Sequence, residues 1–181
     1  MPKKIAVIIG SLRKESFNRK IANELIRLSS KKLNMEIIEI GDLPHYNEDL
    51  DENPPKFWVE FRTKIKTKDA ILFVSPEYNR TIPGVLKNAI DVGSRPPGKS
   101  VWDGKLAAVA TASPSNLGGF GSNHNIRQAF VFLNVPLMQQ PEMYLSKVNE
   151  SFLKDGKTVN AKTAAYLQKF LDGFEKWVYQ F

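Results

Sequence analysis

The sequence predicts an α/β protein whose doubly wound parallel sheet has five strands in the order 2-1-3-4-5. Strand and helix patterns alternate along the 181 residues, and the runs at residues 5–9, 70–74 and 106–112 are almost entirely apolar. Such runs are typical of parallel strands that helices cover on both faces. Each run stops at a polar loop, and in a sheet of this order these loops meet at the carboxyl edge. The strand order itself is taken by analogy with other doubly wound sheets.

Composition and charge narrow the class of protein. With 42% hydrophobic and 25% charged residues, the sequence is typical of one globular domain over residues 1–181, and no apolar stretch approaches the roughly 18 residues of a membrane span. We therefore expect a cytoplasmic protein. The net charge of +7 is scattered along the chain without a nucleic-acid-binding motif, so we expect an anionic small molecule and no nucleic acid as partner.

The cysteine and histidine content excludes several kinds of chemistry. The sequence has no cysteine, which excludes disulfides, thiolate catalysis and cysteine metal sites. The two histidines lie far apart, so we predict no metal site. His124 is expected to be a structural residue on a helix face, and His45 to lie in a surface loop. We therefore expect a bound cofactor to supply the chemistry.

The first third of the chain predicts two helices and an edge strand. From Phe17 onward, apolar residues recur at helical spacing and predict a helix after the first strand. Residues 35–40 alternate polar and apolar side chains, as expected of a strand at the edge of the sheet. A loop rich in Asp, Asn and Pro follows at residues 41–55, and a second helix is predicted at residues 56–66.

The middle of the chain predicts one helix between two buried strands. After the strand at residues 70–74, Thr81 is expected to cap a helix that has Pro83 in its first turn and ends near Gly93. A connection rich in Pro and Gly then leads to the strand at residues 106–112. The tryptophans are expected to be packing residues rather than cofactor contacts: Trp58, Trp102 and Trp177.

The last third predicts two helices and the fifth strand. A Gly-rich loop at residues 113–121 precedes a helix at residues 122–133. The last strand is predicted at residues 135–138, where Pro136 fits an edge position. The final helix is predicted at residues 161–178 from its regular apolar spacing.

The loop after the first strand has the side chains of a phosphate site. Ser11, Ser16 and Asn18, the guanidinium of Arg13 and the free amides of the following helix together offer several donors to a dianionic phosphomonoester. The loop lacks the Gly-Lys-Ser/Thr end of a nucleotide P-loop and the glycines of the dinucleotide fingerprint. The alternative is that Ser16 only caps the helix.

Several motifs are similar to those of a known family. Gly-Ser-Leu-Arg-Lys-Glu-Ser-Phe-Asn at residues 10–18, Pro-Glu-Tyr-Asn at residues 76–79 and Pro-Gly-Val-Leu-Lys-Asn-Ala-Ile-Asp at residues 83–91 resemble the NADPH-dependent FMN reductase family, including its bacterial quinone and chromate reductase members. Ser-Arg-Pro at residues 94–96 also lies where the family has it, and residues 127–142 resemble the quinone reductase branch. The resemblance implies a flavodoxin-like sheet that binds FMN at its carboxyl edge.

The resemblance also implies which residues hold the cofactor. In it, the flavin N5 carries the chemistry and no side chain is catalytic, while Tyr78 and Arg95 line the site. An aromatic side chain such as Tyr78 can cover the flavin ring while neighbouring backbone amides reach the polar edge of the ring. The residues expected to bind FMN are Ser11, Arg13, Ser16, Phe17, Asn18, Pro76, Glu77, Tyr78, Asn79, Ser113, Gly118 and Gly119.

The function implied is a ping-pong oxidoreductase. Hydride passes from NADPH or NADH to the flavin N5, and two electrons then pass to a quinone-like acceptor, an azo compound, chromate or free flavin. The alternative is a flavodoxin-type electron carrier without nicotinamide turnover, which the net charge of +7 disfavours because a carrier that docks on basic reductases is expected to be acidic. A flavin-free interaction module does not explain three polar loops at one edge.

We also expect the chain to form a homodimer or homotetramer. Residues 130–133 place apolar side chains around more of their helix than one buried stripe requires. Arg127 and Glu142 lie in stretches that resemble those used for subunit contacts in the quinone reductase branch. The alternative for this charged pair is a solvated position on the surface of a monomer.

Overall fold

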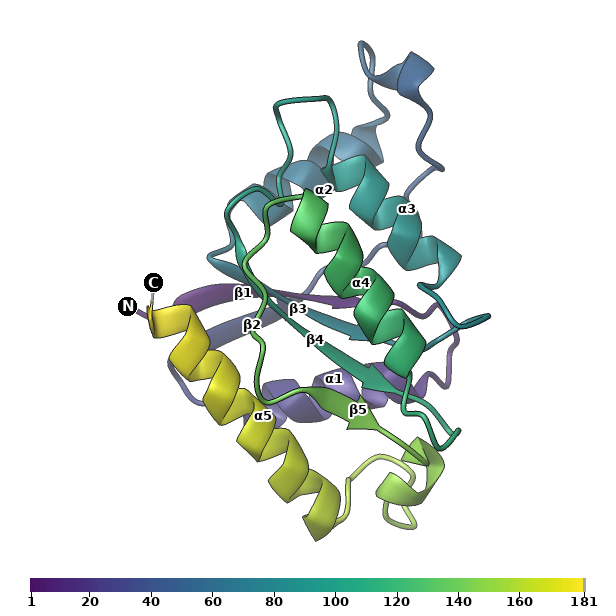
Figure 1. Ribbon diagram of the computed structural model, residues 1–181, viewed down its shortest axis with the longest axis vertical. Helices are drawn as coiled ribbons and strands as arrows, with labels where there is room; N and C mark the ends of the chain where they lie inside the picture. Colours follow the sequence, from purple (N-terminus) through teal and green to yellow (C-terminus); the bar gives the residue numbers. More distant parts are fainter. Residues whose placement is uncertain (181) are drawn as a thin grey trace.

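The computed structural model describes residues 1–180 and contains the predicted five-stranded sheet, with the strand order β2-β1-β3-β4-β5 and all neighbouring strands parallel (Figure 1). The strands are β1 (Lys3–Ile9), β2 (Leu33–Ile37), β3 (Ala70–Ser75), β4 (Leu106–Ala112) and β5 (Met143–Leu145). The α/β class, the topology and the flavodoxin-like arrangement are therefore confirmed.

Helices cover both faces of the sheet. The helices are α1 (Phe17–Leu28), α2 (Lys56–Lys66), α3 (Gly84–Gly93), α4 (Phe120–Phe132) and α5 (Ala161–Gln180). Figure 1 shows α1 and α5 on one face and α2, α3 and α4 on the other. Two short 3-10 helices, Glu48–Leu50 and Val148–Ser151, lie in the connecting segments. Within residues 1–180, no helix is both long and apolar enough to cross a membrane.

The buried strands divide their side chains between two hydrophobic cores. In β1, Ile5 and Val7 pack with α1 and α5, whereas Ala6 and Ile8 pack with α2, α3 and α4. Successive residues of a strand point to opposite faces, so a strand covered on both sides has to be apolar throughout. This explains why the three central strands appear in the sequence as continuous apolar runs.

The predicted position of the second strand is wrong by two to three residues. The structure has β2 at Leu33–Ile37 rather than residues 35–40, because pairing with β1 begins at Lys3 opposite Leu33, after a short connection from the end of α1 at Leu28. Ile38 still donates its backbone N–H to Val7 O at 3.0 Å before the chain leaves the sheet. The alternation of burial at residues 33–40 does not mark where pairing starts.

The predicted position of the fifth strand is also wrong. Residues 135–138 make only an isolated parallel bridge, between Leu137 and Ala107, and β5 forms later at Met143–Leu145. Pro136 has no N–H to donate, although its carbonyl accepts a bond from Ala107 N at 3.0 Å. The chain then passes outside the sheet and returns beside the end of β4. The prediction of a strand at residues 135–138 rested on their hydrophobicity alone.

Two helix starts differ from prediction. The N-cap residue of α3 is Pro83, without a side-chain cap, because Thr81 pairs instead with Tyr78 in a tight turn. Helix α4 begins at Phe120, two residues before the predicted start. The packing role predicted for tryptophan is confirmed at Trp58 and Trp102, which are fully buried.

Candidate functional site at the carboxyl edge

The loops after β1, β3 and β4 meet at the carboxyl edge and enclose a small cavity of about 90 Å³. This volume suits a phosphate group rather than an aromatic ring system. Two of the lining residues, Ala112 and Pro114, were not predicted. Neither side chain carries a polar group that would mark it as a binding residue in the sequence. The predicted residues that line the cavity are Ser11, Arg13, Ser16, Phe17, Asn18, Pro76, Glu77, Tyr78 and Ser113.

Ser16 is both a helix cap and a wall of the cavity. It is the N-cap residue of α1, and its Oγ accepts a hydrogen bond from Arg19 N at 3.2 Å. A hydroxyl that accepts a bond from a helix amide keeps its own proton to donate. The cap and the phosphate interpretations of Ser16 are therefore compatible, because the two roles use different parts of one hydroxyl group.

Asn18 presents a buried acceptor that has no partner. Its side-chain nitrogen donates to Ala112 O at 3.0 Å, which fixes the orientation of the amide. Its Oδ1 is buried and makes no hydrogen bond within the described residues 1–180, although Asn18 is only 3% exposed and lines the cavity. A buried polar atom without a partner costs free energy unless a ligand or water satisfies it. An acceptor suits a ligand hydroxyl better than a phosphate oxygen.

The positive charge at the cavity comes from Arg13. Its side chain is exposed and lines the cavity, and its backbone N–H donates to Ser11 Oγ at 3.4 Å. The nearby acidic residue, Glu15, pairs with Lys20 at 3.0 Å, and this ammonium lowers the pKa of the Glu15 carboxyl. Arg13 therefore lines the cavity near a carboxylate that already has a cation of its own.

The loop after β3 forms a tight turn. Tyr78 and Thr81 exchange two backbone hydrogen bonds of 3.2 and 3.0 Å, and the two residues between them, Asn79 and Arg80, have φ values of 50° and 64°. Two left-handed residues between paired neighbours are the geometry of a type I′ turn. The ring of Tyr78 is exposed at the carboxyl edge, where an aromatic ligand can reach it. Asn79 does not line the small cavity.

The glycines after β4 are required for close packing. Gly118 and Gly119 have φ values of 59° and 83°, and a Cβ atom on either would lie 2.7 Å from Tyr144 C or 2.8 Å from Thr111 Cβ, respectively. Only glycine adopts this conformation in so little space. Both residues are buried, and neither lines the small cavity. They shape the path of the loop into α4.

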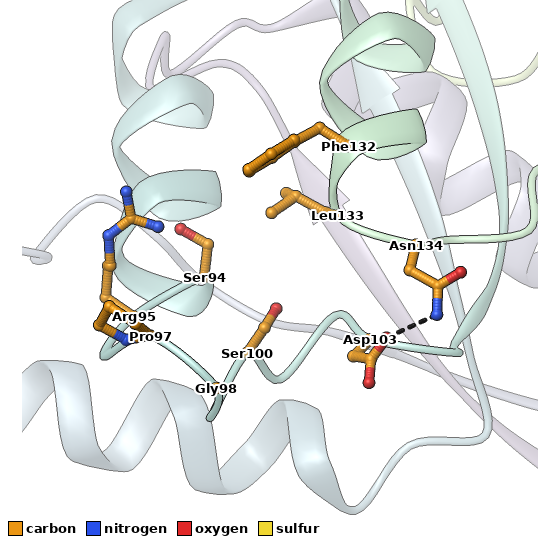
Figure 2. A pocket seen from close by; sticks show the side chains of 9 residues that line it. All are labelled: Ser94, Arg95, Pro97, Gly98, Ser100, Asp103, Phe132, Leu133 and Asn134. Carbon is orange, nitrogen blue, oxygen red and sulfur yellow. Dashed lines mark hydrogen bonds between the residues drawn. The ribbon is translucent and has the colours of Figure 1, made fainter.

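Arg95 does not line the small cavity at the carboxyl edge. It lines a second cavity, of about 320 Å³, between the ends of α3 and α4 (Figure 2). Because α3 runs back from the carboxyl edge, its last residues and the segment before β4 lie at the amino edge of the sheet. Figure 2 shows Phe132 on the opposite side of this cavity from Arg95. Within one chain, Arg95 and Tyr78 therefore line different cavities, and the expectation that both line one site stays a prediction.

The two histidines lie outside the carboxyl-edge cavity. His124 Nε2 is 3.0 Å from Tyr144 Oη, and its ring packs against Phe120 with centroids 4.2 Å apart. Burial, followed by the nearby Glu142 carboxyl, raises the pKa of Tyr144 to about 12, so this phenol stays neutral at physiological pH. His45 is exposed, as expected. Neither imidazole is placed to act on a ligand in the small cavity.

These features define a class of protein. Hydroxyl donors, a guanidinium and an unpartnered buried acceptor surround a phosphate-sized space, and an exposed aromatic ring lies on the adjacent loop. A phosphate, a polyhydroxyl chain and a flat ring joined in that order would meet these groups in turn. The donor set therefore fits flavin mononucleotide, bound at the carboxyl edge of a doubly wound sheet.

Comparison with known proteins gives the family. Residues 3–150 match the model of the NADPH-dependent FMN reductase family. The chain is 55% identical over 175 residues to a quinone reductase of Pseudomonas putida, which covers 96% of this chain and 94% of the relative. It is 40% identical to a 2-hydroxy-1,4-benzoquinone reductase of Burkholderia sp., over 98% of this chain and 97% of the relative.

A solved structure supports the same assignment. The flavoenzyme NAD(P)H:(acceptor) oxidoreductase FerB of Paracoccus denitrificans has a TM-score of 0.92 and 39% identity, with 98% of both chains covered. The chain belongs to the NADPH-dependent FMN reductase family and is an FMN-dependent NAD(P)H oxidoreductase.

Proposed function

We propose that residues 1–181 form one FMN-binding domain that transfers two electrons from NADPH or NADH to a quinone-like acceptor. The observation that carries this proposal is the carboxyl-edge cavity, where the capping hydroxyl of Ser16, the guanidinium of Arg13 and the unpartnered Oδ1 of Asn18 converge. The similarity to relatives named as quinone reductases supports the choice of acceptor.

The residues around the phosphate have separate roles in this proposal. Ser11, Ser16 and the first amides of α1 donate hydrogen bonds to the phosphate, and Arg13 neutralises its charge. Asn18 accepts a hydrogen bond from a hydroxyl of the ribityl chain, because its side-chain nitrogen is already engaged by Ala112 O. This assigns Asn18 to the sugar chain rather than to the phosphate.

The loops after β3 and β4 hold the ring. Bound FMN supplies a group that accepts hydride from nicotinamide and then reduces the second substrate. Tyr78 offers an aromatic face, Pro76 an apolar surface, and the left-handed Asn79 keeps the turn narrow. Gly118 and Gly119 bring the loop after β4 close to the strands. Tyr78 is 47% exposed, so the donor and then a flat acceptor can reach the same open face.

The alternative is an electron carrier of the flavodoxin type. Flavodoxins share the fold, as the Pseudomonas aeruginosa flavodoxin variant does at a TM-score of 0.54 and 19% identity, a likeness that shows the fold alone. A net charge of +7 suits an enzyme that attracts a phosphorylated nicotinamide. The two candidates differ in whether the protein itself turns over NAD(P)H.

The experiment that tests the proposal is steady-state turnover with both nicotinamides. Purified protein loaded with FMN is assayed against 1,4-benzoquinone, an azo dye and chromate, with free FMN as a background control. We expect NAD(P)H oxidation that the quinone stimulates, with parallel double-reciprocal lines for a ping-pong cycle. Reduction by a partner reductase without any direct NAD(P)H oxidation would establish the carrier instead.

We also propose a cytoplasmic homodimer or homotetramer. Val131 and Phe132 at the end of α4 are 78% and 84% exposed, and Phe132 borders the amino-edge cavity (Figure 2). Exposed apolar side chains beside a cavity of about 320 Å³ are typical of a surface that another protein covers. Location in the cytoplasm is supported by dependence on NAD(P)H and is tested by cell fractionation.

Light scattering at micromolar concentration tests the assembly. Arg127 is an unsuitable probe, since its Nε donates to Asn123 Oδ1 at 2.8 Å and its Nη1 donates to Met138 O at 3.0 Å within the chain. Phe132→Ser removes only an exposed ring and should shift the protein toward smaller species. Phe57→Ser, on a different exposed face, is the matched control and should leave the mass unchanged. A monomeric wild-type protein would refute the assembly without affecting the FMN site.

A further inference from the structure

Helix α4 begins without a capping side chain of its own. Its N-cap residue is Gly119, in the left-handed conformation, and no side chain at this position accepts a bond from the helix amides. The first N–H groups of a helix have no partner within the helix, and they form the positive end of its dipole. A buried helix start of this kind needs an acceptor from another part of the chain.

Glu77 supplies that acceptor from the loop after β3. Its Oε2 accepts a hydrogen bond from Ser122 N at 3.1 Å, and Ser122 is the third residue of α4. This is the amide that an N-cap side chain normally serves. The other oxygen, Oε1, lies 3.3 Å from Arg80 Nη1. The side chain of Glu77 is only 10% exposed, so both oxygens are committed to protein partners.

The loop after β3 and the first turn of α4 are in close contact. A Cβ atom on Gly121 would lie 2.6 Å from Arg80 O and 2.9 Å from Glu77 Oε2. The side-chain nitrogen of Asn125 donates to Gly121 O at 2.7 Å and reaches Arg80 O at 3.4 Å. The backbone of the turn therefore lies directly on the first turn of α4.

The tight turn links the position of Glu77 to that of Tyr78. The two backbone hydrogen bonds between Tyr78 and Thr81 make the turn a narrow hairpin, and Tyr78 follows Glu77 directly in the chain. A displacement of the Glu77 carboxylate relative to α4 would therefore shift Tyr78 relative to Gly118 and Gly119, which precede the helix.

We propose that Glu77 is a positioning residue that sets the spacing between the loops after β3 and β4, and thereby the width of the slot for the flavin ring. This inference rests on the proposed function. It differs from the sequence-based expectation, in which Glu77 contacts FMN itself. The hydrogen bond to Ser122 and the ion pair with Arg80 engage the carboxylate with protein groups, so it acts on the flavin through the Tyr78 turn.

Two substitutions of Glu77 test the proposal. Glu77→Gln keeps an oxygen of similar position for Ser122 N–H, whereas Glu77→Ala removes the acceptor. FMN affinity is measured by quenching of flavin fluorescence, and the visible circular dichroism of the bound flavin reports its surroundings. We expect Glu77→Ala to weaken FMN binding about tenfold and to alter the dichroism. Glu77→Gln should keep the wild-type spectrum and an affinity within about threefold.

A second route removes the same bond from the helix side. Ser122→Pro deletes the same N–H in the first turn of α4. Because proline is best tolerated at the first helical position and Ser122 is the third, far-UV circular dichroism checks that the helix still forms. Ser122→Pro should weaken FMN binding as Glu77→Ala does, and the double variant should be no worse than either single one. Lys87→Ala, which breaks an exposed ion pair with Asp91 on α3, is the control and should leave the affinity unchanged.

Three outcomes would overturn the proposal. Equal losses in Glu77→Gln and Glu77→Ala would show that the negative charge, and not the hydrogen bond to Ser122, carries the effect. Wild-type affinity and dichroism in Glu77→Ala would show that the bond does not position the loop. Additive losses in the double variant would show that the two groups do not act through one contact. Absence of FMN binding by the wild-type protein would instead refute the proposed function on which the inference rests.

Discussion

The two cavities at opposite edges of the sheet differ in how their polar groups are used. At the amino edge, in the cavity of about 320 Å³, Ser94 donates to Asp91 O at 2.8 Å and Asn134 donates to Asp103 at 2.7 Å. At the carboxyl edge, in about 90 Å³, Asn18 keeps a buried acceptor without a partner. In the larger cavity Asn134 and Asp103 bond each other and Ser94 bonds the backbone. In the smaller one the Oδ1 of Asn18 is left as a buried acceptor without a partner in the described residues.

From this difference we infer that unused hydrogen-bonding capacity is a better guide to a ligand site than cavity volume is. A wall whose groups already bond one another gains little from a polar ligand, because the ligand has to replace existing bonds. A buried acceptor that no protein group satisfies gains a full bond when the ligand binds. We therefore expect substitutions at the amino edge to affect stability and substitutions at the carboxyl edge to affect binding.

The largest effect is expected at the amino edge, from Trp102→Ala. Trp102 is fully buried, donates through Nε1 to Ile90 O at 2.9 Å and packs so closely on Gly93 that a Cβ there would lie 2.4 Å from its ring. Loss of this side chain should lower the free energy of unfolding by about 3–5 kcal/mol. Urea unfolding measures the loss, and FMN affinity of the folded fraction should stay at its wild-type value. A loss below about 1 kcal/mol would contradict the structural role.

The next effect is expected at the carboxyl edge, from Arg13→Ala. Loss of a charge-assisted phosphate contact should weaken FMN binding by about 1.5–3 kcal/mol, and the flavin should be lost on dialysis. The urea midpoint of the flavin-free protein should not change, because Arg13 is exposed. Lys14→Ala removes the same charge from a side chain outside the small cavity and serves as the control. Unchanged FMN affinity in Arg13→Ala would show that the loop after β1 only caps α1 and does not bind the phosphate.

A smaller effect is expected from Tyr78→Ala. An aromatic contact is worth about 0.5–1.5 kcal/mol beyond area burial, so we expect kcat/KM for the quinone to fall about three- to tenfold. The thermal midpoint of the flavin-free protein should hardly move, since Tyr78 is 47% exposed. Tyr78→Phe keeps the ring and should retain activity. A large loss of stability with normal kinetics would place Tyr78 among the packing residues instead.

The smallest effect is expected from the exposed pair of Arg19 and Glu39, which are 2.7 Å apart beside the carboxyl edge. The hydrogen bond from Arg19 lowers the pKa of the Glu39 carboxyl in the folded protein. The ionised pair therefore stabilises the protein above the unfolded pKa, and the contribution is lost as pH falls through the lowered folded pKa.

Urea unfolding of wild type and Glu39→Gln measures this contribution. Because Glu39 is 63% exposed, solvent screening limits the difference in stability at neutral pH to below about 1 kcal/mol. The difference should shrink as the pH is lowered from about 5 to about 3. A difference that grew toward low pH would contradict the sign of the shift.

The sequence by itself determined the class of sheet and predicted the candidate phosphate loop. Continuous apolar runs arise because a strand covered on both faces buries every side chain, and this requirement is local. The grouping of Ser11, Arg13, Ser16 and Asn18 is local too, since all four follow one strand within a few residues. The hydroxyls, the guanidinium and their placement after a buried strand were therefore visible without coordinates.

Only the tertiary structure decided what depends on contacts between distant segments. The fifth strand formed at Met143–Leu145 because pairing with the end of β4 outweighed the hydrophobicity of residues 135–138. Arg95 was separated from Tyr78 by the direction of α3, and Glu77 was turned toward α4 by an amide 45 residues away. Such contacts depend on which chain segments come together in space. A single sequence gives the residues but does not show which distant residues are in contact.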